Sequence, residues 1–205
     1  MASRRWPLRF QRTGIVMIDA TPYTREQLET AMRQTHSLPG INLSGADLSG
    51  MRLIGLLLPG ANLSGVNLQN AIIGGADLDG ADLSGANGHN AVFVGVNLDG
   101  SNCRSVQFAQ ARFTGVNWTS ADATGADLSR CKLSRVNVTG TDFSQAITDG
   151  SQSRLTDWTK AKVPPNPLPA PAASAAPQWL TYSAVFSLLA FLIWLLRHKR
   201  TAQPD

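Results

Sequence analysis

Large apolar residues recur at every fifth position between Ile41 and Gln145, and the register does not change once along this stretch. Each follows an Asn or Asp in 14 of the 21 repeats, and the residue before that is small, most often alanine. Thirteen repeats end in glycine, so the consensus reads Ala-Asx-Leu-x-Gly. Only Gly88 among the central residues lacks an apolar side chain. The central residues are Leu43, Leu48, Leu53, Leu58, Leu63, Leu68, Ile73, Leu78, Leu83, Gly88, Phe93, Leu98, Cys103, Phe108, Phe113, Trp118, Ala123, Leu128, Leu133, Val138 and Phe143.

This period of five matches neither the 3.6-residue period of an α-helix nor the two-residue period of a strand. Self-similarity at a fixed period is typical of solenoids, in which each unit buries its apolar face only by stacking on its neighbours. The pattern therefore predicts a coil of four short sides. Each side contributes one large and one small inward residue, with Asx and glycine at the corners.

The repeats resemble those of the pentapeptide-repeat family, and the resemblance covers about half of the chain. It implies an all-β solenoid, a right-handed four-sided parallel β-helix with the central Leu or Phe and the preceding Ala pointing inward. About five coils are expected, or about 25 Å at the spacing of stacked strands. Gly88 should then stack beneath Phe108, whose ring would occupy the space that the glycine leaves.

The pattern divides the chain into a basic, disordered arm (1–22), a capping helix (23–40), the repeat β-helix (41–160), a Pro/Ala-rich linker (161–178), a transmembrane helix (179–196) and a basic tail (197–205). Thr24 and Gln27 predict a capping box, and Leu28 lies on the apolar face of the helix that follows. Such a helix would close the N-terminal end of the solenoid. At the other end the register should fade through Thr148, with Trp158 in phase as a lid.

An uncharged run of 18 residues extends from Trp179 to Leu196, and basic residues follow it directly. As a helix it would be about 27 Å long, which just crosses the hydrocarbon core of a bilayer. Trp179 and Trp194 stand near its two ends, as in an aromatic belt. The proline-rich stretch before it favours an extended spacer between solenoid and membrane.

The membrane orientation is in conflict at the sequence level. Arg9 and Arg12 interrupt the only stretch that could serve as the apolar part of a signal peptide, and either Met1 or Met17 could be the start. A C-terminal anchor without a signal peptide implies a cytoplasmic solenoid. The positive-inside rule would instead keep the basic tail inside and place the solenoid outside. We expect a single-pass, tail-anchored protein with its solenoid in the cytoplasm.

The sequence suggests no catalytic, cofactor-binding or metal site. His36, His89 and His198 have no spaced partner, while Cys103 and Cys131 fall on inward positions, where a thiol fills apolar space. The acids Asp77, Asp79 and Asp82 follow the repeat and fit solvated turns. A pI of about 9.5 would favour nucleic acid. The repeat itself, however, has six basic and eight acidic residues, so no nucleic-acid partner is expected.

One side of the coil departs from the consensus. Three of the four Asx columns, read 20 residues apart, keep mainly Asn and Asp. The fourth column and its neighbours mix apolar and basic residues, which often mark a partner surface. The alternative is sequence drift or improved strand propensity on one face. The predicted interaction strip is Arg52, Ile54, Ile72, Val92, Val94, Arg112, Lys132 and Arg135.

Together these features predict a non-catalytic, membrane-tethered module for protein interaction or scaffolding, with an unknown protein partner and an open oligomeric state. The resemblance suggests one alternative, because some pentapeptide-repeat proteins mimic DNA and bind type II topoisomerases. That role requires a continuous acidic surface. The mixed charges of the repeat favour the interaction module.

Overall fold

The computed structural model describes residues 10–11, 14–15 and 21–172. The expected transmembrane helix (179–196) and the basic tail (197–205) lie outside these residues. No helix in the described part of the chain is long and apolar enough to cross a membrane. In the arm, β1 (Phe10–Gln11) and β2 (Gly14–Ile15) form an antiparallel pair.

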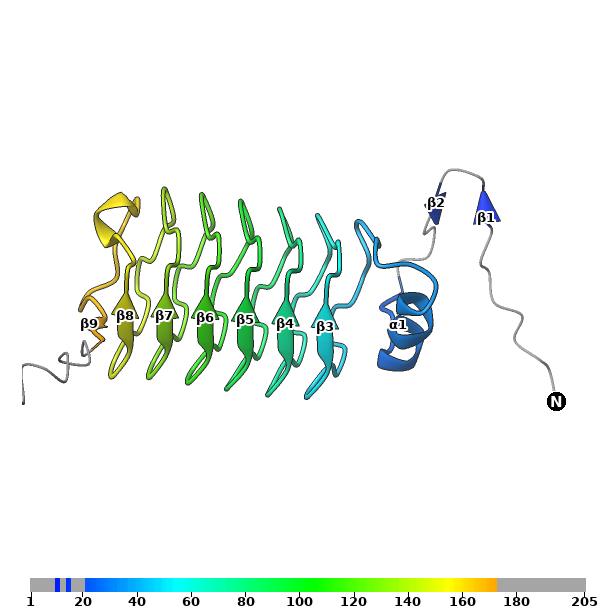
Figure 1. Ribbon diagram of the computed structural model, residues 1–205, viewed down its shortest axis with the longest axis horizontal. Coiled ribbons are helices and arrows are strands. Elements are labelled where there is room, and N and C mark those ends of the chain that lie inside the picture. The colour runs from blue at the N-terminus through cyan, green and yellow to red at the C-terminus, as the bar shows by residue number, and fades with distance from the viewer. Residues whose placement is uncertain (1–9, 12–13, 16–20, 173–205) are drawn as a thin grey trace, which may run out of the picture. The chain divides into compact units, whose positions relative to one another are not determined.

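The repeats form a parallel β-solenoid of about six turns whose coils are held together by a seven-stranded sheet (Figure 1). From β3 to β8, each strand pairs with the next in a register of 20 residues, for example Arg52 with Ile72. Isolated parallel bridges keep the same offset on the other three sides, as between Asn42 and Asn62. The strands are β3 (Arg52–Ile54), β4 (Ile72–Gly74), β5 (Val92–Val94), β6 (Arg112–Thr114), β7 (Lys132–Ser134), β8 (Gln152–Arg154) and β9 (Ala170–Pro171).

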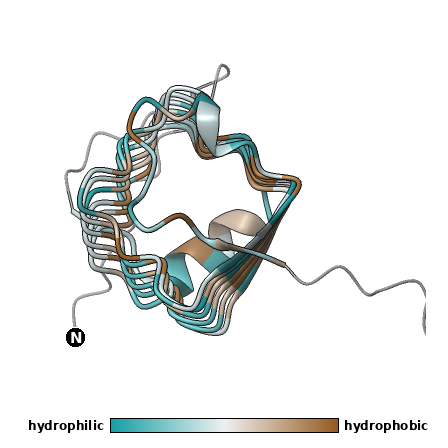
Figure 2. Ribbon diagram, turned by 90° about the vertical axis from the view of Figure 1, so that its left-hand side faces the viewer, coloured by the Kyte–Doolittle hydropathy of each residue, from teal (hydrophilic) through white to brown (hydrophobic). Residues whose placement is uncertain are grey.

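The successive coils superpose when viewed along the stack, so residues 20 apart in the sequence lie in columns (Figure 2). The four columns of paired residues confirm the predicted four-sided coil. The last residue of each repeat has a left-handed backbone, as at Gly80 with a φ of 60°. Glycine takes this conformation without steric cost, whereas other residues pay about 1 kcal/mol. Arg130 and Arg135 nevertheless adopt it, with φ of 56° and 55°.

The inward residues form one continuous core. Leucines fill the first coils, and aromatic rings stack through the later ones. Phe93 and Phe113 lie 4.9 Å apart between ring centroids, and Trp118 lies 5.2 Å from Phe113. Aromatic pairs at these distances add about 1 kcal/mol each beyond the area they bury.

The solenoid is one turn longer than expected, because the register does not fade at Thr148. Thr148, at the central position, and Ser151, at the small inward position, are both buried, and their hydroxyls donate to the backbone carbonyls of Pro167 and Thr148. The Ser151 hydroxyl donates to the carbonyl of Thr148 at 2.6 Å, and Ser101 makes the same bond to Leu98 at 2.8 Å. A hydroxyl satisfied in this way costs little when it is buried.

At the N-terminal end, α1 (Arg25–Met32) lies next to the first coil, beyond β3 (Figure 1). The predicted capping box is present: the Gln27 backbone N–H donates to the Thr24 hydroxyl, and the Thr24 N–H donates to the Gln27 side chain. Leu28 is completely buried in the core. The helix is shorter than the segment 23–40, because Leu38 already pairs with the next coil through a bond from its N–H to the Leu57 carbonyl.

At the C-terminal end, the segment 161–172, assigned to the linker from its composition, packs on the last coil. Val163 pairs with Asp142, and β9 pairs with β8. The 3-10 helix η1 (Trp158–Lys160) places Trp158 5.4 Å from Phe143 between ring centroids. Proline cannot donate a backbone hydrogen bond, and it is tolerated here because β9 is the edge strand of the sheet.

The small core residue Gly88 gives a first prediction. A Cβ atom at Gly88 would lie 2.4 Å from Cδ1 and 2.5 Å from Cε1 of Phe108. We expect Gly88→Leu to lower the free energy of unfolding by about 1–3 kcal/mol, because overpacking displaces the ring. Chemical denaturation followed by circular dichroism measures the loss.

The matched control combines Gly88→Leu with Phe108→Leu, which restores the consensus residue in both coils. The double variant should lose less stability than the sum of the two single variants, since a leucine in place of the Phe108 ring makes room for the new side chain. Strictly additive losses would contradict this account of the packing.

Candidate interaction surface

The side of the solenoid formed by β3–β8, here called the strand side, brings the predicted strip together. Arg52, Ile72, Val92, Arg112 and Lys132 are paired in register from strand to strand, so they form one column. Stacked strands lie about 4.8 Å apart, which places each side chain beside the next.

A second column on the strand side lies two residues further along each strand. Ile54 is 44% exposed and Val94 is 46% exposed, with Gly74 between them. A Cβ atom at Gly74 would lie 3.0 Å from Cδ1 of Ile54, so the isoleucine leans over the glycine. Arg135 follows β7 at the corner. Apart from Arg52, the strip therefore has an apolar half over β3–β5 and a basic half over β6 and β7.

The other three sides explain why Asn and Asp recur. Their Oδ1 atom accepts the backbone N–H two residues later, as from Ser44 to Asn42 at 3.1 Å. Asn side chains also donate to the Asx of the preceding coil, as from Asn97 to Asp77 at 2.9 Å. These bonds fix each turn and tie neighbouring coils together. The Asx residues on these sides thus have a structural role.

The strand side has extended backbone in place of these Asx turns, so its outward residues are released from the consensus. Strand propensity alone would favour β-branched residues such as Ile72 and Val92. It does not favour Arg112 beside Lys132, because like charges opposite each other in a ladder are destabilising. Arg135 adds the steric cost of a left-handed backbone. The β-branched residues alone are explained by the strand geometry.

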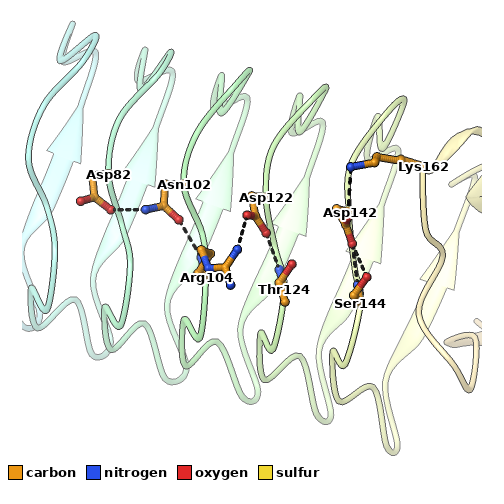
Figure 3. Close-up of polar contacts among 8 residues, drawn as sticks. All are labelled: Asp82, Asn102, Arg104, Asp122, Thr124, Asp142, Ser144 and Lys162. Carbon is orange, nitrogen blue, oxygen red and sulfur yellow. Dashed lines mark hydrogen bonds and ion pairs between the residues drawn. The ribbon is translucent and has the colours of Figure 1, made fainter.

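The opposite side of the solenoid lies ten residues further along each coil, and charged residues form ion pairs there (Figure 3). Nη1 of Arg104 lies 2.8 Å from Oδ2 of Asp122, and Nζ of Lys162 lies 3.3 Å from Oδ2 of Asp142. Burial raises the pKa of Asp122, but hydrogen bonds from Thr124 and Arg104 outweigh it and lower the pKa overall. Two of the three carboxylates in the Asx column of this side are paired with a cation, while Arg112, Lys132 and Arg135 have no ion pair within the described residues.

The remaining candidates for chemistry have structural roles. Cys103 and Cys131 are free and buried. Burial raises their pKa to about 11 and about 12, so both thiols stay protonated near neutral pH. Oδ1 of Asn87 accepts the backbone N–H of His89 at 3.1 Å. Within the described residues, no three His, Cys, Asp or Glu side chains gather closely enough to hold a metal ion.

One small cavity of about 20 Å³ lies in the core of the first coils. Leu28, Leu43 and Leu48 are among the residues that line it, and its wall is apolar. The volume is close to that of a single water molecule, which would have no polar partner there. This cavity is a packing defect and offers no ligand site.

Comparisons with known proteins agree with this geometry. A family model described as pentapeptide repeats matches residues 41–80, 73–102 and 101–140. A pentapeptide-repeat protein from the cyanobacterium Cyanothece 51142 has a solved structure with a TM-score of 0.52, 21% identity, and coverage of 63% of this chain and 96% of its own. The repeat domain therefore belongs to the pentapeptide-repeat family.

Two further solved structures are similar to this chain in part. The plasmid-mediated fluoroquinolone resistance protein QnrB1 is 25% identical, with 62% of this chain and 67% of that chain covered and a TM-score of 0.43. A pentapeptide-repeat protein from the thylakoid lumen of Arabidopsis thaliana is 31% identical, with 50% and 68% covered and a TM-score of 0.29. No curated protein matches the chain significantly.

The opposite side predicts a pH dependence of stability. Hydrogen bonds from the side chain and backbone of Ser144, followed by Lys162, lower the pKa of Asp142. A carboxylate whose pKa is lower in the folded state stabilises the fold above its usual pKa of about 4. This stabilisation should disappear as the pH falls from about 4 through the lowered value. Unfolding free energies measured between pH 6 and pH 2 test this.

Ser144→Ala should reduce this acid-dependent loss of stability more than Lys162→Gln does. Each effect should be less than about 1 kcal/mol, because both groups are partly solvated. Ser64→Ala is the control, since the Ser64 hydroxyl donates to the uncharged Asn62 at 2.7 Å. Its effect on stability should not vary with pH. The reverse order of Ser144 and Lys162 would contradict the assigned cause.

Proposed function

We propose that this protein is a non-catalytic interaction module whose strand side binds a protein partner and whose segment 179–196 anchors it in a membrane, with the solenoid in the cytoplasm. Proteins built of pentapeptide repeats are generally structural or binding proteins. The anchor and the partner go beyond that general statement. They rest on the apolar run in the sequence and on the strip.

The observation that supports the partner most directly is the exposure of Ile54 and Val94 in one patch. Nearly half of each side chain is open to solvent. The residues between them, Ile72, Gly74 and Val92, are apolar and half-buried, so the patch is continuous across β3–β5. A rigid apolar patch flanked by arginines is a common anchor for a protein partner.

The alternative function, mimicry of DNA, requires a continuous acidic stripe. The most acidic column contains Asp82, Asp122 and Asp142, but Asn102 interrupts it. Arg104 and Lys162 also neutralise two of the three carboxylates. No observation on the described surface favours the mimic.

If the strip binds a partner, substitutions in it should affect partner binding much more than they affect the stability of the fold. Replacing Ile72 and Val92 by Asn should abolish recovery of the partner in a detergent pull-down. It should lower the unfolding free energy by about 1 kcal/mol per residue, the range of strand propensities and cross-strand pairs. Mass spectrometry of the recovered proteins and thermal unfolding of the same samples measure both effects.

Leu57→Asn is the matched control, because Leu57 is also an exposed apolar residue in an outward column, on the neighbouring side. This variant should keep the partner that the unmodified protein recovers. Loss of the same partner from both variants, or from neither, would remove the case for the strand side.

The anchor predicts membrane fractionation of the full chain with resistance to carbonate extraction. A chain ending after Ala172 should remain in the soluble fraction and stay folded, because residues 163–172 complete the last coil and are retained. Ending the chain at Lys162 instead should lower stability. Recovery of the full chain in the soluble fraction would contradict the anchor.

A further inference from the structure

The final coil, together with the segment 163–172 that completes it, exposes more large apolar side chains than any other coil of the described solenoid. Six large apolar side chains are exposed within the described residues, and three of them, Ile147, Leu155 and Leu168, belong to this coil. Leu155 is 69% exposed and has a left-handed backbone with a φ of 55°. The first four residues of this corner column on the strand side are glycines, from Gly55 to Gly115. In the last two coils, this column therefore has large exposed side chains, Arg135 and Leu155, in place of the favoured glycine.

Uncompensated positive charge accompanies these apolar residues. Lys132, Arg135 and Arg154 are exposed on the strand side of the last two coils. The Arg135 backbone N–H donates to the Arg154 carbonyl at 2.9 Å, so the two residues are direct neighbours. None of the three has an ion pair within residues 21–172. The acids of this end, Asp142, Asp149 and Asp157, lie on the other three sides.

The number of residues between this end and the apolar run sets an upper limit on the distance between them. β9, the last described strand, pairs with β8 on the strand side. Eight peptide steps separate Pro171 from Trp179. Even a fully extended chain covers at most about 28 Å in that number of steps. A bilayer that holds the segment 179–196 is therefore within reach of the final coil.

We propose that the strand-side rim of the final coil, formed by Lys132, Arg135, Arg154 and Leu155, docks on the anionic phospholipid surface of the membrane. Basic side chains attract the phosphate and carboxylate headgroups, and Leu155 enters the interface, as in other peripheral membrane surfaces. The opposite side, with its acids, faces away. The apolar patch over β3–β5 stays free for a partner, because its nearest strand, at Val92, lies two strand spacings, about 10 Å, from Lys132.

This inference rests on the proposed anchor, and the experiment separates the two. The full chain with Gln152→Cys, an exposed position on β8, is labelled with a fluorophore. The native thiols are buried and should not react. The protein is incorporated into phosphatidylcholine vesicles with or without about 20% phosphatidylserine, both containing a lipid with a quencher on its headgroup. Flotation reports the anchor, and time-resolved fluorescence reports the fraction of docked molecules.

Docking predicts strong quenching only with phosphatidylserine, and reversal by about 0.5 M NaCl because salt screens the attraction. Replacing Arg135 and Arg154 by Gln should reduce the ratio of quenched to unquenched molecules about 25-fold, or about fivefold per basic residue. Replacing Arg33 and Arg52 by Gln changes the net charge equally at the other end and should have no effect. A label at Gln69→Cys, in an early coil and off the strand side, should stay unquenched.

The outcomes distinguish the two proposals. Flotation with both vesicle types without serine-dependent quenching overturns the docking surface and leaves the anchor. Flotation only with phosphatidylserine, reversed by salt, supports docking and rejects the anchor. Failure to float with either overturns both. Fluorophore self-quenching that is independent of lipid composition would instead assign the exposed leucines to a second copy of the chain, and would also overturn the proposal.

Discussion

Most backbone hydrogen bonds of the described solenoid run between neighbouring coils, and the rest of the structure depends on that arrangement. The Leu43 N–H donates to the Asn62 carbonyl at 2.7 Å, and the Asn62 N–H donates to the Ile41 carbonyl at 2.9 Å. The same pattern repeats along the solenoid. Each coil is the template for the next. A residue can therefore be replaced by another type, but it cannot move to another column without breaking the hydrogen bonds between coils.

Because of these bonds, the sequence can depart from the repeat consensus mainly at the two ends of the solenoid and at the outward positions. An open end would expose core side chains and unpaired backbone groups. Leu28 of α1 is buried at one end, and Trp158 covers Phe143 at the other. The proline-rich segment ends the sheet with few backbone donors, which makes it a poor template for a further strand. The prolines of residues 163–172 thus help to terminate the sheet, independently of any role as a spacer.

The outward positions separate the four sides by their chemistry. On three sides, Asn and Asp side chains form the hydrogen bonds of the turns and of the contacts between coils, so the composition of these sides follows from the fold. The strand side needs no such bonds, because its backbone is extended. Its apolar and basic residues are consequently the part of the surface for which the fold gives no sufficient reason. Both the proposed partner surface and the proposed membrane contact lie there.

The sequence alone determined the period, the inward residues, the 20-residue columns and the capping box, because each depends on spacing that a stacked coil must repeat. It also indicated the strip, since departure from a regular consensus is visible without coordinates. Only the tertiary structure showed that the strip coincides with the extended side, and that Asx side chains bond within and between coils on the other three. It also showed that buried hydroxyls and a proline-rich segment continue the stack beyond Phe143. Composition could not show this, because a serine in the core or a proline in a strand is favourable only when a particular carbonyl or sheet edge lies beside it.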